Sequence, residues 1–197
     1  MSIKLPVITT DRLILRSLAK KDARAVFAYA KLPHVGPNAG WVPLKTLEEA
    51  HQFIRYSLQK QKNGQPGVWA IVLAASRTVI GVIELHSYRK HKAEIGFALH
   101  PAYWNQGIIT EATKAVMVYA FEVLKLQRLA YAHFLDNSTS RRVAEKCGFS
   151  FEGVKRKGFM HGDGRVLDEA ILSYTDDDYE KNRQTIFEPF KAKLTIK

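Results

Sequence analysis

The middle of the chain carries three strand-like segments in close succession, and this feature limits the possible folds more than any other. Residues 68–74, 79–87 and 93–99 are short and rich in β-branched or aromatic side chains. Turn-forming or polar residues separate them, so we expect them to pair as consecutive antiparallel strands. A helix then follows, because apolar side chains recur at steps of three and four residues over 108–124. This order predicts a sheet with helices packed on it.

The flanking regions add strands and helices of the same kinds. Further strands are predicted at residues 12–18, 128–134 and 165–175, and further helices at 21–30, 46–61, 137–149 and 175–194. Thr46 and Glu49 have the spacing of a capping box, and Asp136 or Asn137 caps the helix that follows it. The expected fold is α/β (α+β), a mixed and mostly antiparallel central sheet flanked by helices, in one domain covering residues 1–197.

The charge of the chain is strongly positive. It carries 30 Lys and Arg against 19 Asp and Glu, which gives a formal net charge of +11. Such an excess favours a polyanionic partner. The basic residues are spread along the chain and form no dense arm, so a phosphate-rich cofactor is favoured. Direct contact with RNA, and with it proximity to the ribosome, is the alternative.

Several classes of protein are excluded by composition. The longest apolar run, residues 68–75, is far shorter than the ~20 residues that a membrane helix needs, and the start of the chain has no signal-peptide core. A single cysteine, Cys147, excludes an intramolecular disulfide framework. The histidines lack a spacing typical of metal ligands. We therefore expect a cytoplasmic protein with no membrane partner and no metal.

The stretch YWNQGIITEA, residues 103–112, places a bare glycine at the start of the central helix. The first amides of a helix lack intrahelical partners and lie in a partial positive charge, so they bind anions when nothing bulky covers them. Gly107 leaves that approach open, which predicts a phosphate or pyrophosphate site. A glycine that only turns the corner between strand and helix explains this residue alone equally well.

Four stretches together resemble the GNAT superfamily of acyl-CoA-dependent N-acetyltransferases. They are TTDRLILRSLAKKDA (9–23), VWAIVLAASRTVIGVIEL (68–85), AEIGFALHPAYWNQGIITEA (93–112) and DNSTSRRVAEKCGFSFEGVKRK (136–157). Within the superfamily, the chain looks most like the branch that includes the ribosomal-protein alanine acetyltransferases (RimJ/RimL-like). The resemblance implies acetyl-CoA as the acyl donor and an amine as the acceptor.

The resemblance also assigns residues to the donor. One strand would splay from its neighbour and pair with the pantetheine arm, and the amides at the start of the central helix would hold the pyrophosphate. Asn137 would hydrogen-bond the pantetheine arm, although a plain helix cap also explains it. The expected donor-binding residues are Phe97, Ala98, Leu99, Asn105, Gln106, Gly107, Ile108, Ile109, Thr110 and Asn137.

Direct attack in a ternary complex requires a base for the amine and a proton for the departing thiolate. Glu94, on the strand beside the donor motif, is the expected base, and Glu84 on the preceding strand is its rival. Many family members carry a tyrosine as proton donor where this chain has Ala144, so Ser140 is expected to supply the proton. A hydroxyl with only local bonds is the alternative for Ser140. Cys147 is expected to be structural.

The acceptor is expected near residues 34–43 and the helix after them, with Trp41 lining its site unless that ring only packs in the core. The loop at 159–169 is a further candidate for the acceptor side. An α-amino group, with a pKa of about 8, loses its proton far more easily than a lysine of about 10.4. This difference favours the N-terminus of a protein, such as a ribosomal protein, as the acceptor. A small amine, an antibiotic or a polyamine is also open, as is a non-catalytic module that binds acyl-CoA or RNA. A homodimer is compatible with the sequence.

Overall fold

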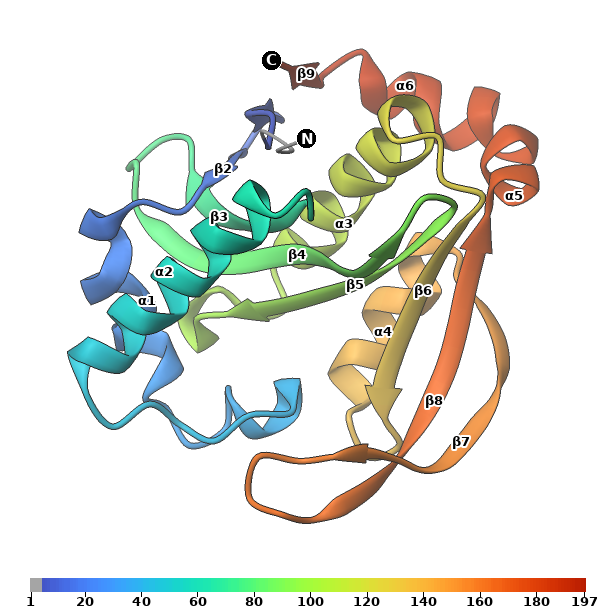
Figure 1. Ribbon diagram of the computed structural model, residues 1–197. Coiled ribbons are helices and arrows are strands. Elements are labelled where there is room, and N and C mark those ends of the chain that lie inside the picture. Colours follow the sequence, from blue (N-terminus) through green and yellow to red (C-terminus); the bar gives the residue numbers. More distant parts are fainter. Residues whose placement is uncertain (1–4) are drawn as a thin grey trace.

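A computed structural model describes residues 5–197, and within them nine strands form one sheet (Figure 1). The strands are β1 (Ile8–Thr9), β2 (Leu13–Ser17), β3 (Gly67–Leu73), β4 (Val79–Arg89), β5 (Lys92–Leu99), β6 (Arg128–Phe134), β7 (Ser150–Met160), β8 (Val166–Thr175) and β9 (Thr195–Ile196). Their order in the sheet is β7-β8-β6-β5-β4-β3-β2-β1-β9. The antiparallel succession of β3, β4 and β5 confirms the arrangement expected from the sequence.

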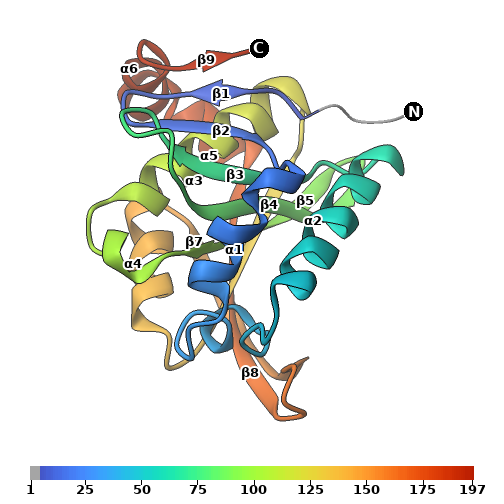
Figure 2. The ribbon, with the colours of Figure 1, turned by 90° about the vertical axis from the view of Figure 1, so that its left-hand side faces the viewer.

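Helices cover both faces of this sheet (Figure 2). They are α1 (Ala23–Ala30), α2 (Leu47–Lys62), α3 (Ile108–Val118), α4 (Ser138–Cys147), α5 (Asp176–Lys181) and α6 (Glu188–Lys191). Successive side chains of a strand point to opposite faces, so Val82 belongs to the core under α1 and α2, and Ile83 to the core under α3 and α4. The predicted class, a mostly antiparallel sheet flanked by helices, is confirmed. Within the described chain, none of these helices is long and apolar enough to cross a membrane.

Strands β5 and β6 are parallel neighbours that separate partway along their length. Lys92–Ile95 pair with Arg128–Tyr131, and the pairing ends there. Beyond that point β5 continues beside β4, and β6 continues beside β8. Figure 1 shows the two strands diverging. The sheet therefore opens into two halves, and the splayed strand pair expected from the sequence is present.

Some elements differ from the sequence-based predictions. The short strands β1 and β9 and the edge strand β7 were not predicted, and β7 has two register shifts against β8 and is largely exposed. The helix predicted over 108–124 is α-helical only to Val118 and ends in a π-helical turn, η4 (Tyr119–Val123). The last predicted helix, 175–194, is divided by a second π-helical turn, η5 (Arg183–Phe187).

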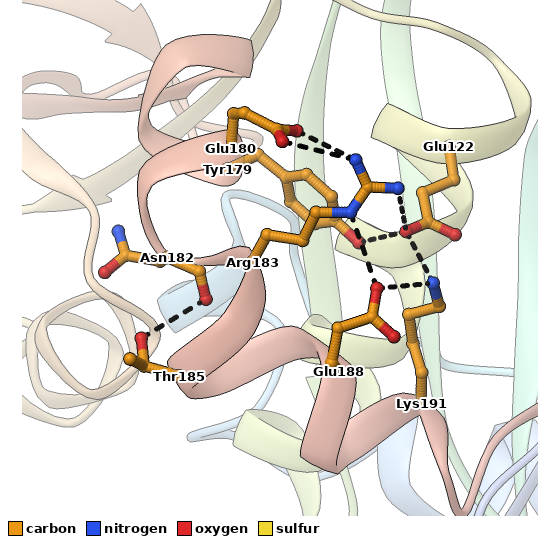
Figure 3. Close-up of polar contacts among 8 residues, drawn as sticks. All are labelled: Glu122, Tyr179, Glu180, Asn182, Arg183, Thr185, Glu188 and Lys191. Carbon is orange, nitrogen blue, oxygen red and sulfur yellow. Dashed lines mark hydrogen bonds and ion pairs between the residues drawn. The ribbon is translucent and has the colours of Figure 1, made fainter.

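A cluster of polar side chains attaches the C-terminal helices to the end of α3 (Figure 3). Glu122 Oε1 accepts hydrogen bonds from Tyr179 Oη at 3.0 Å and from Lys191 Nζ at 2.9 Å. Glu188 Oε1 pairs with Lys191 Nζ at 3.1 Å and with Arg183 Nε at 3.4 Å. These contacts fix α5 and α6 near the C-terminal end of α3. Gly107, where the predicted anion site begins, lies at the other end of this helix.

Candidate active site

A cavity of about 840 Å³ lies where β5 and β6 separate. Its wall is formed by α1, the loop between α1 and α2, the start of α3, α4 and the end of β7. Every predicted site residue except Gln106 lines this cavity, including Glu94, Ser140 and Asn137. Trp41 lines the cavity while also packing against the core under α1 and α2, and its role toward the acceptor stays a prediction.

The start of α3 borders the cavity with an uncapped first turn. Gly107 is the N-cap of α3 and has a φ of +72°, a left-handed conformation that favours glycine. None of the described side chains caps it. The next residues, Ile108, Ile109 and Thr110, line the cavity. The free donors expected at this helix end therefore belong to the wall of the cavity.

The loop before α3 is held by a charged residue that the sequence did not suggest. Arg12 pairs with Glu111, with Nε to Oε2 at 2.6 Å and Nη2 to Oε2 at 2.5 Å. Its Nη1 donates to the carbonyl oxygen of Gln106 at 3.0 Å. The Gln106 side chain instead donates to Ala102 O at 3.0 Å. Gln106 is not among the residues that line the cavity, and the contact predicted between its amide and the donor stays a prediction.

The first turn of α4 contains two of the predicted residues in one hydrogen-bonded group. Asn137 Oδ1 accepts from Ser140 N at 3.0 Å, so Asn137 is the helix cap that the sequence suggested. The hydroxyl oxygens of Ser140 and Tyr131 lie 2.8 Å apart, and Tyr131 Oη also donates to Ser140 O at 2.9 Å. Burial raises the pKa of Tyr131 above its ordinary value, so this phenol keeps its proton. Tyr131 lines the cavity and was not predicted.

The two candidate bases lie in different surroundings. Glu94 on β5 faces His86 on β4 in the register of the sheet, and their Oε1 and Nε2 atoms lie 3.8 Å apart. Glu94 lines the cavity and its side chain is about one-third exposed, so it is open to solvent and ligand. Glu84 also lines the cavity, but Lys60 Nζ lies 3.3 Å from its Oε2. The carboxylate of Glu84 is therefore already neutralised by an ammonium group, whereas that of Glu94 faces only an imidazole.

A third carboxylate lines the cavity and was not singled out from the sequence, although it ends the segment 159–169 that was a candidate for the acceptor side. Glu169 on β8 is only 9% exposed and pairs in register with Phe134 on β6. Burial raises its pKa, against a smaller opposing effect of Lys155. The sequence does contain a signal for it. On an alternating strand Glu169 shares a face with Leu167 and Ile171, so a carboxylate stands between two apolar side chains.

The loop at residues 34–43, between α1 and α2, closes one end of the cavity and is hydrogen-bonded to two other segments. It contains the short turn η2 (Pro37–Ala39). Asn137 Nδ2 donates to Asn38 O at 3.1 Å, and Gly162 N, in the β7–β8 turn, donates to Gly40 O at 3.3 Å. These hydrogen bonds join residues of α4, the loop and the hairpin that line the same cavity, so this end is enclosed by chain from three directions.

Cys147 is a buried free thiol against α3. Its Sγ lies 3.9 Å from Thr110 O, and burial raises its pKa to about 12. A thiol with this pKa is protonated and unreactive near neutral pH, which agrees with the structural role expected for it. Over residues 5–197, no group of three or more His, Cys, Asp or Glu side chains could hold a metal ion.

Comparison with known proteins identifies the family to which this chain belongs. Residues 12–150 match the family described as the acetyltransferase (GNAT) domain. The chain belongs to this GNAT family. It is therefore an N-acetyltransferase, and its acetyl donor is acetyl-CoA, as in the rest of the family.

Individual relatives support the GNAT assignment over most of the chain. The uncharacterized N-acetyltransferase YoaA of Bacillus subtilis (strain 168) is 34% identical over 172 residues, which cover 85% of this chain and 96% of that protein. The L-amino acid N-acetyltransferase AaaT of Escherichia coli (strain K12) is 22% identical over 167 residues, covering 83% and 98%. A GNAT-family acetyltransferase structure from Bacillus anthracis has a TM-score of 0.76 and 28% identity, covering 87% and 99%.

Proposed function

We propose that this GNAT acetyltransferase acts on the α-amino group of a protein N-terminus, by direct attack of the amine on acetyl-CoA in a ternary complex. The observation that carries the proposal is the position of Glu94, an accessible carboxylate at the point where β5 leaves β6. A carboxylate of this kind can deprotonate an amine with a pKa of about 8 far more easily than a lysine of about 10.4. The acceptor is therefore an α-amine.

The donor would be held by the residues that line the splayed edge and the start of α3. The backbone of Phe97, Ala98 and Leu99 offers a strand edge to the pantetheine arm, and the first amides of α3 offer donors to the pyrophosphate. Asn137 caps α4 with Oδ1 and has a second amide hydrogen on Nδ2 available for the pantetheine arm. Bound in this way, acetyl-CoA supplies the activated acetyl group.

The reaction then needs three actions from the protein. Glu94, directly or through water, takes the proton of the acceptor ammonium, and the neutral nitrogen attacks the thioester carbon. The carbon–sulfur bond breaks, Ser140 gives a proton to the thiolate, and the second N–H proton of the acylated nitrogen replaces the proton that Ser140 lost. Tyr131 Oη lies 2.8 Å from Ser140 Oγ, so it orients this hydroxyl. Ala144, at the position of the family's tyrosine, is buried and has no acidic proton to give.

The enclosed shape of this part of the cavity favours a chain terminus, rather than a side chain on a folded surface, as the acceptor. The loop at 34–43 is bound to both Asn137 and Gly162, so a substrate must enter as an extended segment. The resemblance to ribosomal-protein alanine acetyltransferases and the net charge of +11 support an acceptor protein that is bound to RNA. A free amino acid or another small amine is the second candidate, since about 840 Å³ is in the usual range for a small-molecule site.

Thiol release from acetyl-CoA tests the proposal. The panel contains a peptide with a free N-terminal alanine, the same peptide with a blocked N-terminus and an internal lysine, and free L-alanine. We expect turnover of the first and little of the second. Glu94→Gln should lower kcat by about 100-fold or more. Glu145→Gln is the matched control, because Glu145 is exposed on α4 and pairs with Arg141. Turnover of the lysine peptide alone, or full activity of Glu94→Gln, would contradict it.

A further inference from the structure

The side chain of Glu169 is mostly buried, but its unpartnered carboxylate oxygens are not fully covered and remain accessible. The residue is 9% exposed and borders the cavity. From residues 5–197 it accepts no hydrogen bond, and its nearest cation, Lys155 Nζ, lies 3.9 Å away on a side chain that is 62% exposed. Buried carboxylates are normally hydrogen-bonded, because desolvation of the charge is otherwise uncompensated. A group left in this state beside a cavity indicates a functional site.

The edge strand β7 makes room for this carboxylate. A Cβ at Gly158 would lie 2.9 Å from Glu169 Oε2 and 2.7 Å from the side chain of Lys155. The register of β7 against β8 also shifts between Lys155 and Phe159. The missing side chain at Gly158, in this irregular part of β7, therefore leaves room for the carboxylate of Glu169 that a larger residue would occupy.

The charged groups around Glu169 come from three neighbouring strands. Lys155 on β7 and His86 on β4 favour its charged form, whereas Glu94 on β5 opposes it. Burial is the largest influence and raises the pKa. Glu169 belongs to the half of the sheet that contains β6 and β8, and Glu94 belongs to the half that contains β4 and β5. Both carboxylates line the same cavity, one on each side of the split.

We propose that Glu169 binds the acceptor in its ammonium form and holds it for deprotonation by Glu94. The inference rests on the proposed transfer to an amine and adds a residue that selects the acceptor. An ammonium group supplies the three donors and the positive charge that Glu169 lacks. When Glu94 then takes one proton, the nitrogen becomes neutral and is released from Glu169 to attack the thioester. The second N–H proton replaces the one that Ser140 gives to the thiolate, so charge and protons balance.

The test separates binding of the acceptor from the chemical step. The acceptor is a peptide with a free N-terminal alanine, and the variants are Glu169→Gln, Glu169→Asp and the surface control Glu145→Gln. Charge-assisted hydrogen bonds of this kind predict a KM for the peptide about 10- to 100-fold higher in Glu169→Gln, with a smaller change in kcat and an unchanged KM for acetyl-CoA. Glu169→Asp restores the charge and should recover part of the affinity.

Two further measurements distinguish this role from a structural one. An uncompensated buried charge predicts that Glu169→Gln melts at the same or a higher temperature than the wild type. In the wild type, the peptide KM should rise as pH falls through the pKa of Glu169, and this dependence should disappear in Glu169→Gln. An unchanged peptide KM in a folded Glu169→Gln protein would overturn the proposal.

Calorimetry keeps this inference separate from the proposed function. The free peptide and its N-acetylated form are titrated into protein saturated with CoA. If no peptide is acetylated, the proposed acceptor is wrong, but weaker binding of the free amine to Glu169→Gln than to the wild type still supports a site for ammonium. Equal binding of the free and acetylated forms to the wild type would refute that site.

Discussion

Replacing Arg12 with alanine should loosen the loop before α3 without removing any atom that lines the cavity. Arg12 makes two contacts with Glu111, at 2.6 and 2.5 Å, and a third with Gln106 O at 3.0 Å. The Glu111 side chain is 13% exposed. In the variant its carboxylate stays largely buried, with Thr10 Oγ1 at 2.6 Å as its closest remaining donor. The variant therefore leaves a buried charge poorly compensated.

The contacts of Arg12 determine the expected loss in the free energy of unfolding. A hydrogen bond to a charged group contributes about 1.5–3 kcal/mol, and exposure of an ion pair lowers its contribution. Because the Arg12 side chain is 49% exposed, we take the lower part of that range and expect the free energy of unfolding to fall by about 1–2 kcal/mol. If the loop must be rigid to bind the donor, the same free energy weakens binding of CoA by about 5- to 30-fold.

Urea denaturation and calorimetric titration with CoA measure the two effects. Arg55→Ala is the matched control, since Arg55 pairs with Glu48 at 2.6 Å on α2 but both side chains are more than half exposed. Exposed pairs contribute about 0–1 kcal/mol, so the control should change stability little and CoA affinity not at all. If Arg12→Ala and Arg55→Ala behave alike in both assays, Arg12 does not support the donor loop.

Three other predictions address the cavity wall and the edge of the sheet. Ser140→Ala removes the proposed proton donor and should lower kcat by about 100-fold, whereas Tyr131→Phe removes only the group that orients it and should lower kcat by about fivefold. The double variant should be no worse than Ser140→Ala, because Tyr131 acts through Ser140. Thiol-release assays check this. Cys147, with a pKa of about 12, should resist iodoacetamide in the native protein at pH 8 and react on unfolding, as followed by mass spectrometry. Hydrogen bonds from Arg128 lower the pKa of Glu152 from 4.5 to about 2, so its stabilising effect is present above pH 4.5 and lost as pH falls toward 2. The difference in urea midpoint between wild type and Glu152→Gln should shrink over that interval, and a constant difference would contradict the assignment.

Local signals in the sequence were sufficient for much of the fold. Alternating or β-branched segments located β3 to β6 and β8, and polar caps located the starts of α2 and α4 at Thr46 and Asn137. These features depend on residues within a few positions of one another. Edge strand β7 was missed because it is exposed along most of its length and irregular in register, so it has no apolar alternation to detect.

The residues missed in the site depend on contacts between distant parts of the chain. Arg12 is 99 residues from Glu111, and the sequence around either position does not indicate that the two side chains pair. Tyr131 could be predicted as a buried strand residue, but its bond to Ser140 depends on how α4 packs against β6. Glu169 required knowledge that β8 lies beside β6, with that face open to the cavity. The assays above test the roles predicted for Glu94 and Ser140, and the role of Trp41 stays a prediction.

The separation of β5 from β6 divides the sheet into two halves that share four rungs of backbone pairing. Glu94 is part of the third of these rungs, opposite Ala130 on β6, and it also pairs with His86 on β4. The backbone of the candidate base is therefore anchored on both of its sides at the edge of the opening. The sheet itself, and not the molecule that enters the opening, sets the position of this carboxylate.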